Sequence, residues 1–397
     1  ICALLTKTVT ATLPAALLLV LWWQRGKLEL RRDVTPLIPW FVVAALAGVF
    51  TAWVERTVIG ASGDAFALTF VERSLLAGRV ICFYLRKILW PANLIFIYPR
   101  WEIDASVWWQ YLFPAAAIAL GGSLAIVARR WGRRGPLAGY LYFCGTLVPV
   151  LGFVDVFPFL FSYVADHFQY LASLGVIVPI ASGLAMAFER VRWSKNAELV
   201  GGAAVVGILA IATWSRSAVY ADAETLYRDT IARNPAAWMA YQNLGTELAA
   251  RNRLGEAIEA YEGALRAKPD YTAAKANLAL AHMKLGDAAA ESPDRMREAI
   301  EHYQAVLRLD PAHVRAHYNL GTLLMDLPDR QSEAVAHLET AVTLQPDYVE
   351  AHVNLGVLLS AIPPRSQEAI AHLEFAVAKR PELGRLKELI LEIRSRR

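Results

Sequence analysis

The hydrophobic positions follow two different patterns along the chain. In the first half, apolar residues form long runs separated by short polar connectors. A helix that crosses the hydrocarbon core of a bilayer needs about 20 such residues, so these runs predict membrane-spanning helices. The six predicted spans cover residues 2–23, 37–56, 107–128, 137–157, 168–188 and 198–215.

One further segment, residues 70–90, is amphipathic. On a helical wheel its charged residues fall within one stripe of roughly 140°. The stripe contains Glu72, Arg73, Arg79, Arg86 and Lys87. Such a helix can anchor the chain in the membrane interface, or it can tilt so that the charges face a watery cavity and form a basic wall for an anionic lipid headgroup. The sequence leaves both alternatives open, and with them whether the segment crosses the membrane.

The second half consists of repeated units in which apolar residues recur at helical spacing. The prolines that close these units, Pro235, Pro269, Pro311, Pro346 and Pro381, lie 34, 42, 35 and 35 residues apart. A period near 34 residues with paired helices is the signature of the tetratricopeptide repeat. The predicted fold class is therefore all-α, a polytopic transmembrane helix bundle followed by a tetratricopeptide repeat α-solenoid.

The domain prediction follows from these two patterns. A membrane domain covers residues 1–216 and a repeat domain covers 217–381. We predict that the repeat domain contains a half repeat at 221–235 and full repeats at 238–271, 272–313, 314–348 and 349–381. A capping helix is predicted to follow it at 382–397. In the second full repeat Ala279 replaces the usual glycine, and the sequence DAAAESPD is predicted to lengthen the turn between its helices.

An asparagine precedes the Leu-Gly or Leu-Ala pair of every full repeat. These residues are Asn243, Asn277, Asn319 and Asn354. On the concave face of the solenoid their amides would donate to and accept from a bound peptide backbone, although they could instead bond only their own helices. The histidines of this half contain no repeated His-x-x-x-His pair, so the sequence predicts no metal site.

Charge divides the chain in the same place as hydropathy. The mean hydropathy is +0.34, and residues 1–220 hold 19 Lys and Arg against 11 Asp and Glu, whereas the remainder holds 21 against 25. The basic connectors at 24–33, 128–135 and 189–195 are predicted to be cytoplasmic. The chain is thus predicted to be an integral membrane protein, in a bacterial inner membrane, with its repeats on the periplasmic or luminal side. No nucleic-acid partner is predicted.

Ionisable residues also interrupt the apolar runs. Lys7 lies in the first run, and Asp166 and His167 begin the fifth. Ionisable groups at membrane depth usually face a protein interior or a cavity and mark function. Lys7 could instead snorkel to the interface, and the other two could lie just outside the hydrocarbon.

Three motifs in this order resemble the transmembrane and tetratricopeptide repeat O-mannosyltransferases, which belong to the GT-C class of glycosyltransferases. The motifs are TKTVTATLP, YLRKILWPANLIFIYP and ADHFQYLASLG. The resemblance implies transfer of a sugar from a polyprenyl phosphate, whose phosphate is held by cationic residues. The candidates are Lys7, Arg79, Arg86, Lys87, Asp166 and His167, and His167 stands where the family often has arginine.

The resemblance also implies a catalytic acidic pair in the first outer loop, often near a divalent metal. Glu55 and Asp64 do not match that setting, so no catalytic residue, metal site or cofactor is assigned in this chain. The base is expected upstream of Ile1, in a longer protein, and this part alone is expected to be inactive.

The leading interpretation is the C-terminal part of a membrane glycosyltransferase that moves a sugar, mannose in the family it resembles, to protein acceptors. Its partners would be membrane lipid, the polyprenyl-phosphate sugar and a polypeptide in the repeat groove. The alternative is a non-catalytic, membrane-anchored scaffold for envelope protein assembly, which makes the charges in the apolar runs incidental.

Overall fold

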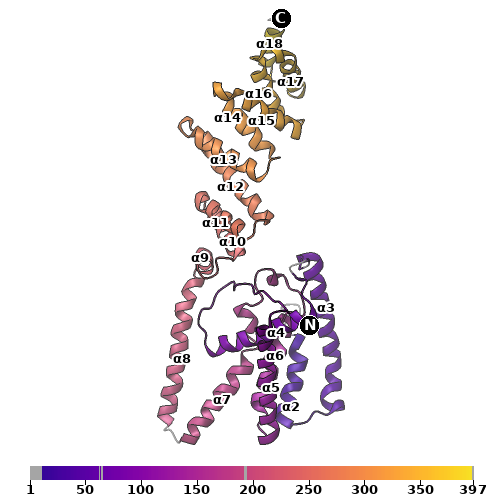
Figure 1. The fold of residues 1–397 in the computed structure, drawn as a ribbon, viewed down its shortest axis with the longest axis vertical. Helices are drawn as coiled ribbons and strands as arrows, with labels where there is room; N and C mark the ends of the chain where they lie inside the picture. Colours follow the sequence, from indigo (N-terminus) through magenta and orange to yellow (C-terminus); the bar gives the residue numbers. More distant parts are fainter. Residues whose placement is uncertain (1–10, 62, 64–65, 192–194, 396–397) are drawn as a thin grey trace. The chain divides into compact units, whose positions relative to one another are not determined.

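The computed structural model describes residues 11–61, 63, 66–191 and 195–395, and every regular element in these ranges is a helix. The predicted all-α class is confirmed. The chain divides into two compact units, Ile1–Ala240 and Tyr241–Arg397 (Figure 1). Helix α9 (Ala223–Arg233), which the sequence assigns to the half repeat, belongs to the first unit. The predicted domain limits stay predictions.

The first unit contains seven further helices among its described residues. They are α2 (Leu13–Arg25), α3 (Ile38–Val54), α4 (Phe70–Leu89), α5 (Leu112–Trp131), α6 (Gly135–Leu147), α7 (Leu174–Val191) and α8 (Lys195–Ser217). In the part of the chain that the structure describes, three helical segments are long and apolar enough to cross a membrane: Leu30–Ile59, Trp108–Trp131 and Leu199–Tyr220. Each overlaps one predicted span.

The predicted span at 137–157 is wrong in its second half. Helix α6 ends at Leu147 and is followed by a short 3-10 turn that contains Pro149. Proline has no N–H to continue the helical hydrogen bonds, and Gly152 adopts the left-handed conformation with φ of +98°. The chain therefore leaves the helix and forms a loop that folds back on the unit.

The predicted span at 168–188 begins too early. Residues Asp166–Gln169 form a 3-10 turn, and α7 starts only at Leu174. The Asp166 and His167 pair thus belongs to a turn in front of the helix. The first predicted span, at 2–23, lies partly outside the described residues, and α2 covers its second half.

Helix α4 begins with a capping box, in which the side chains of Thr69 and Glu72 accept hydrogen bonds from each other's backbone N–H groups. Its apolar face is buried in the core of the first unit, where Leu76 and Tyr84 have no exposed surface. A Cβ on Gly78 would come within 2.3 Å of the Pro114 nitrogen, so a glycine is required where α4 meets α5. The amphipathic segment at 70–90 is therefore a helix whose apolar face packs against protein.

The repeat helices pack in antiparallel pairs along the chain. They are α10 (Trp238–Ala250), α11 (Leu254–Ala267), α12 (Thr272–Ala290), α13 (Met296–Leu309), α14 (Val314–Met325), α15 (Gln331–Leu344), α16 (Val349–Ser360), α17 (Ser366–Lys379) and α18 (Arg385–Ser395). One apolar core continues from Ala279 to Ile393. Its last contributions, Ile390 and Ile393, come from α18, which covers the end of the core.

The inserted residues of the second full repeat lengthen a helix and leave the turn unchanged. Helix α12 has 19 residues, whereas α14 and α16 have 12 each. Both α12 and α14 end four residues after their close-packed glycines, Gly286 and Gly321, so the seven additional residues lie at the start of α12. The sequence prediction of a longer turn was wrong.

The glycine that approaches the second helix of this repeat is Gly286. A Cβ on Gly286 would lie 2.8 Å from Tyr303 on α13, as a Cβ on Gly321 would lie 2.8 Å from Leu338 on α15. Asn319 lies two residues before Gly321. In the second repeat the residue two positions before Gly286 is Lys284, which is exposed. Asn277 lies seven residues earlier and outside the predicted row of amides.

Candidate functional site

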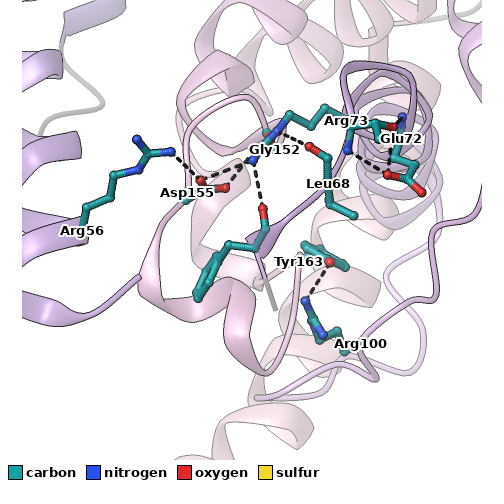
Figure 2. A network of polar contacts seen from close by, with 10 residues as sticks. Arg56, Leu68, Glu72, Arg73, Arg100, Gly152, Asp155 and Tyr163 are labelled. Carbon is teal, nitrogen blue, oxygen red and sulfur yellow. Dashed lines mark hydrogen bonds and ion pairs between the residues drawn. The ribbon is translucent and has the colours of Figure 1, made fainter. Parts of the chain in front are cut away.

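A polar network joins three elements of the first unit around the Asp155 carboxylate. Arg73 on α4 donates to Asp155 Oδ1 at 2.8 Å, and Arg56, at the end of the Leu30–Ile59 segment, donates to Asp155 Oδ2 at 3.3 Å. Figure 2 shows Asp155 between the two guanidinium groups. Two arginines and one aspartate leave a local net charge of about +1.

The two arginines differ in how fully their donors are used. Arg73 also donates to the carbonyl oxygens of Gly152, Leu68 and Phe66, at 2.6, 3.1 and 3.0 Å, and its side chain is only 17% exposed. The Arg56 side chain is 66% exposed. Arg73 therefore fixes the loop that carries Asp155, while Arg56 presents donors to the outside.

Two cavities share this network. One of about 530 Å³ and one of about 430 Å³ are both lined by Arg56, Arg73 and Asp155. Apolar side chains, including Val49, Trp53 and Phe153, form much of the wall of the larger one. A cationic edge beside an apolar wall suits an amphiphilic anion, because the charge and the hydrocarbon each meet a matching surface.

The structure does not bring all of the sequence-predicted phosphate ligands together. Lys7 lies outside the described residues. The Arg79 guanidinium stacks over the Trp101 ring at 4.4 Å. Lys87 is buried, and its Nζ donates to the carbonyl oxygens of Ala92 and Asn93 at 2.6 and 2.9 Å. Donors that are held in this way are less available to a ligand.

The remaining candidates lie near the C-terminal half of α4 or on the surface. The Tyr98 hydroxyl donates to Asp166 Oδ1 at 2.7 Å, and burial raises the pKa of Asp166. Lys87 lies 5.2 Å from the same tyrosine ring. His167 is exposed and packs edge-to-face on Phe168, while Arg86 is exposed. None of these residues lines either of the two cavities among the described residues.

The sequence analysis missed Arg56 and Asp155 as members of a site. A signal was present, because Asp155 is an acid within the predicted span at 137–157, where ionisable residues mark function or a buried partner. Arg73 was placed in the charged stripe of residues 70–90 without a role.

The asparagines of the repeats make contacts between neighbouring repeats. Asn319 Nδ2 donates to Asp287 Oδ1 at 3.0 Å, and Asn354 Nδ2 donates to Thr322 Oγ1 at 2.9 Å. Asn243 and Asn277 are half-buried. In the two better-connected cases the amide holds adjacent repeats together, and peptide binding by the four residues stays a prediction.

No group of three or more His, Cys, Asp or Glu side chains close enough to hold a metal ion occurs within residues 11–61, 63, 66–191 and 195–395. Asp155 accepts from both arginines, and Glu55 accepts from the backbone N–H of Phe157 at 2.9 Å. The divalent metal that the family resemblance implies is therefore not assigned to these two acids.

Comparison with protein families identifies the repeats. A TPR repeat family matches residues 295–327, and a tetratricopeptide repeat family matches residues 216–272 and 243–291. The chain contains tetratricopeptide repeats. Arrays of this kind present extended concave surfaces that bind other proteins, so protein binding or scaffolding is the supported role of these repeats.

Among curated proteins, the chain is similar to the protein O-mannosyl-transferase Tmtc2 of Drosophila melanogaster, with 30% identity over 107 residues. The match spans 27% of this chain and 11% of that protein. The similarity to this transferase is therefore partial.

Solved structures that are similar include YrrB, described as a TPR protein with an unusual peptide-binding site, at 20% identity and a TM-score of 0.30. That match covers 42% of this chain and 80% of YrrB. MamA matches at 18% identity and a TM-score of 0.29, covering 43% of this chain and 95% of MamA. The TPR2B domain of yeast Sti1, in its complex with a Hsp70 peptide, matches at 20% identity and a TM-score of 0.27, covering 30% and 98%.

Proposed function

We propose that this chain is part of a membrane glycosyltransferase whose first unit binds a polyprenyl-phosphate sugar and whose repeats bind the polypeptide acceptor. The observation that carries the proposal is the pair of cavities that share Arg56 at a charged edge beside an apolar wall. The partial similarity to an O-mannosyl-transferase supports the same class of reaction. The repeats then lie on the periplasmic or luminal side of the membrane, with the acceptor.

In this proposal Arg56 is the phosphate ligand. A guanidinium donates paired, charge-assisted hydrogen bonds to phosphate oxygens, and the Arg56 side chain is exposed enough to do so. Arg73 is a positioning residue, because its donors are already taken up by Asp155 and three carbonyl groups. Asp155 orients Arg56, and Trp53 and Phe153 would contact the isoprenyl chain.

The proposal assigns no general base to this chain. Asp155 and Glu55 both accept hydrogen bonds from the chain's own groups, and a base must be able to take a proton from the acceptor hydroxyl. The described residues accordingly supply binding and orientation of the donor, and no step is routed through a metal.

The test is the affinity of the protein, in lipid nanodiscs, for a short-chain polyprenyl phosphate. We expect Arg56→Ala to weaken binding about ten-fold, since one charge-assisted contact is lost, and to leave binding of the uncharged polyprenol unchanged. Arg86→Ala is the matched control, because Arg86 is an exposed arginine of the same unit that lines neither cavity.

Two other results would contradict the assignment of the phosphate to Arg56. A loss with Arg86→Ala alone would return the phosphate to the C-terminal half of α4. No preference for polyprenyl phosphate over polyprenol in the unsubstituted protein would favour the scaffold alternative. That alternative is supported by the structural use of Arg73 and Lys87, which hold carbonyl groups of the protein itself.

A further inference from the structure

Three histidine pairs recur at the same place in three consecutive repeats. Each pair joins the first and second helix of its repeat through the two Nδ1 atoms. The pairs are His282 with His302 at 3.0 Å, His317 with His337 at 2.9 Å, and His352 with His372 at 2.8 Å. Corresponding members are 35 residues apart in the sequence. The first full repeat has Tyr241 and Ala260 at these two positions and lacks the pair.

The hydrogen bonds of two pairs define where the protons lie. His317 Nε2 is 3.0 Å from the Pro311 carbonyl oxygen, and His352 Nε2 is 3.1 Å from that of Pro346. A carbonyl oxygen only accepts, so each of these Nε2 atoms carries a proton and the neutral ring has a lone pair at Nδ1. Its partner must therefore donate an Nδ1–H. In these two repeats the contact holds one proton between two imidazole rings.

This arrangement accepts one further proton more readily than two. Glu333 lies 3.9 Å from the outer Nε2 of His337, and Glu298 lies 3.9 Å from that of His302, so a first added proton meets a carboxylate. A second would place two N–H groups against each other across less than about 3 Å, where neither finds an acceptor and two positive charges repel.

The groups around the pairs include both signs of charge. Arginines that oppose protonation and glutamates that favour it face the rings from the same helix and from neighbouring ones: Arg295, Arg308, Arg330 and Arg365, and Glu298, Glu301, Glu333, Glu339 and Glu368. Burial has the largest effect on the pKa values of these histidines. It lowers the pKa of His282 to about 4 and lowers the pKa of His302, His337, His352 and His372.

We propose that the three histidine pairs form a pH-sensitive device that fastens the two helices of repeats two, three and four at neutral pH and releases them in acid. The released state has both rings of a pair charged and the Nδ1–Nδ1 contact broken. Each repeat of a solenoid depends on its neighbours for its packing. Breaking the histidine contacts in three consecutive repeats therefore destabilises the whole array of repeats. It also destabilises the concave surface that binds protein.

The direction with pH follows from the lowered pKa values. An unfolded histidine has a pKa of about 6.5, so below that pH the unfolded chain binds more protons than the folded repeats, and at His282 this difference extends down to about pH 4. Stability is full above pH 6.5 and is lost as the pH falls through this window. The repeat without a pair has no such loss.

The experiment is hydrogen exchange of the whole chain in nanodiscs at pH 7 and pH 5, corrected for the intrinsic exchange rate and followed by mass spectrometry. We expect protection in peptides from α14 and α15 to fall at least ten-fold at pH 5. Peptides from α11 in the first full repeat are the internal control and should change less than two-fold. Equal losses in both places would overturn the proposal.

Two variants separate titration from packing. His317→Tyr with His337→Ala copies the residues of the first repeat, and His317→Gln with His337→Gln retains an amide hydrogen bond that does not titrate. Either variant should reduce the pH dependence of α14 and α15, and the remainder comes from the intact pairs of the two neighbouring repeats. An undiminished pH dependence in both variants, or a zinc ion that protects the unsubstituted repeats at pH 7, would overturn the assignment of the pairs to protons.

Discussion

Gly286 shows how one backbone position determines the packing of a whole repeat. Its missing side chain allows α12 to approach Tyr303 on α13, where a Cβ would lie only 2.8 Å from the ring. Protein interiors are close-packed, so such an overlap cannot be absorbed without moving a helix or the ring. The same contact recurs at Gly245, Gly321 and Gly356.

We expect Gly286→Ala to lower the stability of the second repeat unit by roughly 1–3 kcal/mol, the usual cost of overpacking. The measurement is the opening free energy of α12 and α13 from hydrogen exchange. Gly255→Ala is the control, because Gly255 is a helical glycine with no atom within 4 Å of the added Cβ. It should be neutral or stabilising by about 0.5–1 kcal/mol. A neutral Gly286→Ala would contradict the close approach.

The histidine pairs were within reach of the sequence, and one error of register hid them. Aligning the second repeat on Ala279 places His282 opposite no histidine of the other repeats. Aligning it on Gly286 places His282, His317 and His352 at one position, four residues before the glycine. The bond between two Nδ1 atoms still depends on how far the helices approach, which no sequence spacing contains.

At the scale of the element, α12 is the exception among the repeat helices. It is seven residues longer than α14 and α16. Each helical residue turns the helix by about 100°, so seven residues complete nearly two full turns. The faces that meet α11 and α13 therefore stay within about 20° of their usual alignment. The insertion is thus compatible with the packing of both neighbours.

Deleting residues from the start of α12 tests this phase argument. Removing residues 272–278 restores a sequence like that of the fourth repeat and turns the helix by only about 20°, so we expect cooperative thermal unfolding to persist. Removing residues 272–276 turns it by about 140° and should abolish protection of α13 in hydrogen exchange. If the two deletions behaved alike, the packing of α12 on its neighbours would not depend on the number of residues inserted.

The helices of the first unit were predicted unevenly, and for a physical reason. Hydropathy detects apolar runs, and it located Leu30–Ile59, Trp108–Trp131 and Leu199–Tyr220. It does not detect where a run stops being helical, and Pro149 and Gly152 end α6 inside such a run. The loop that follows carries Asp155 to Arg73, a contact over 82 residues of sequence that periodicity does not encode.

At the scale of the whole molecule, the side of the membrane on which the repeats lie is a prediction from the basic connectors. Ala290 is exposed at the end of α12, whereas Ala289 beside it is fully buried, so Ala290→Cys is the suitable probe. We expect an impermeant maleimide to label it in intact cells. Gln24→Cys, exposed in a basic connector, should react only after permeabilisation. The reverse pattern would place the repeats in the cytoplasm.

The extra length of α12 also affects what kind of partner fits the repeats. Two additional turns amount to about 10 Å along the helix axis, so α12 is longer than α14 and α16 by about that amount. We expect a straight helical ligand to fit on one side of these additional turns only. An extended segment can bend around them, so we expect the repeats to favour flexible, unfolded polypeptide.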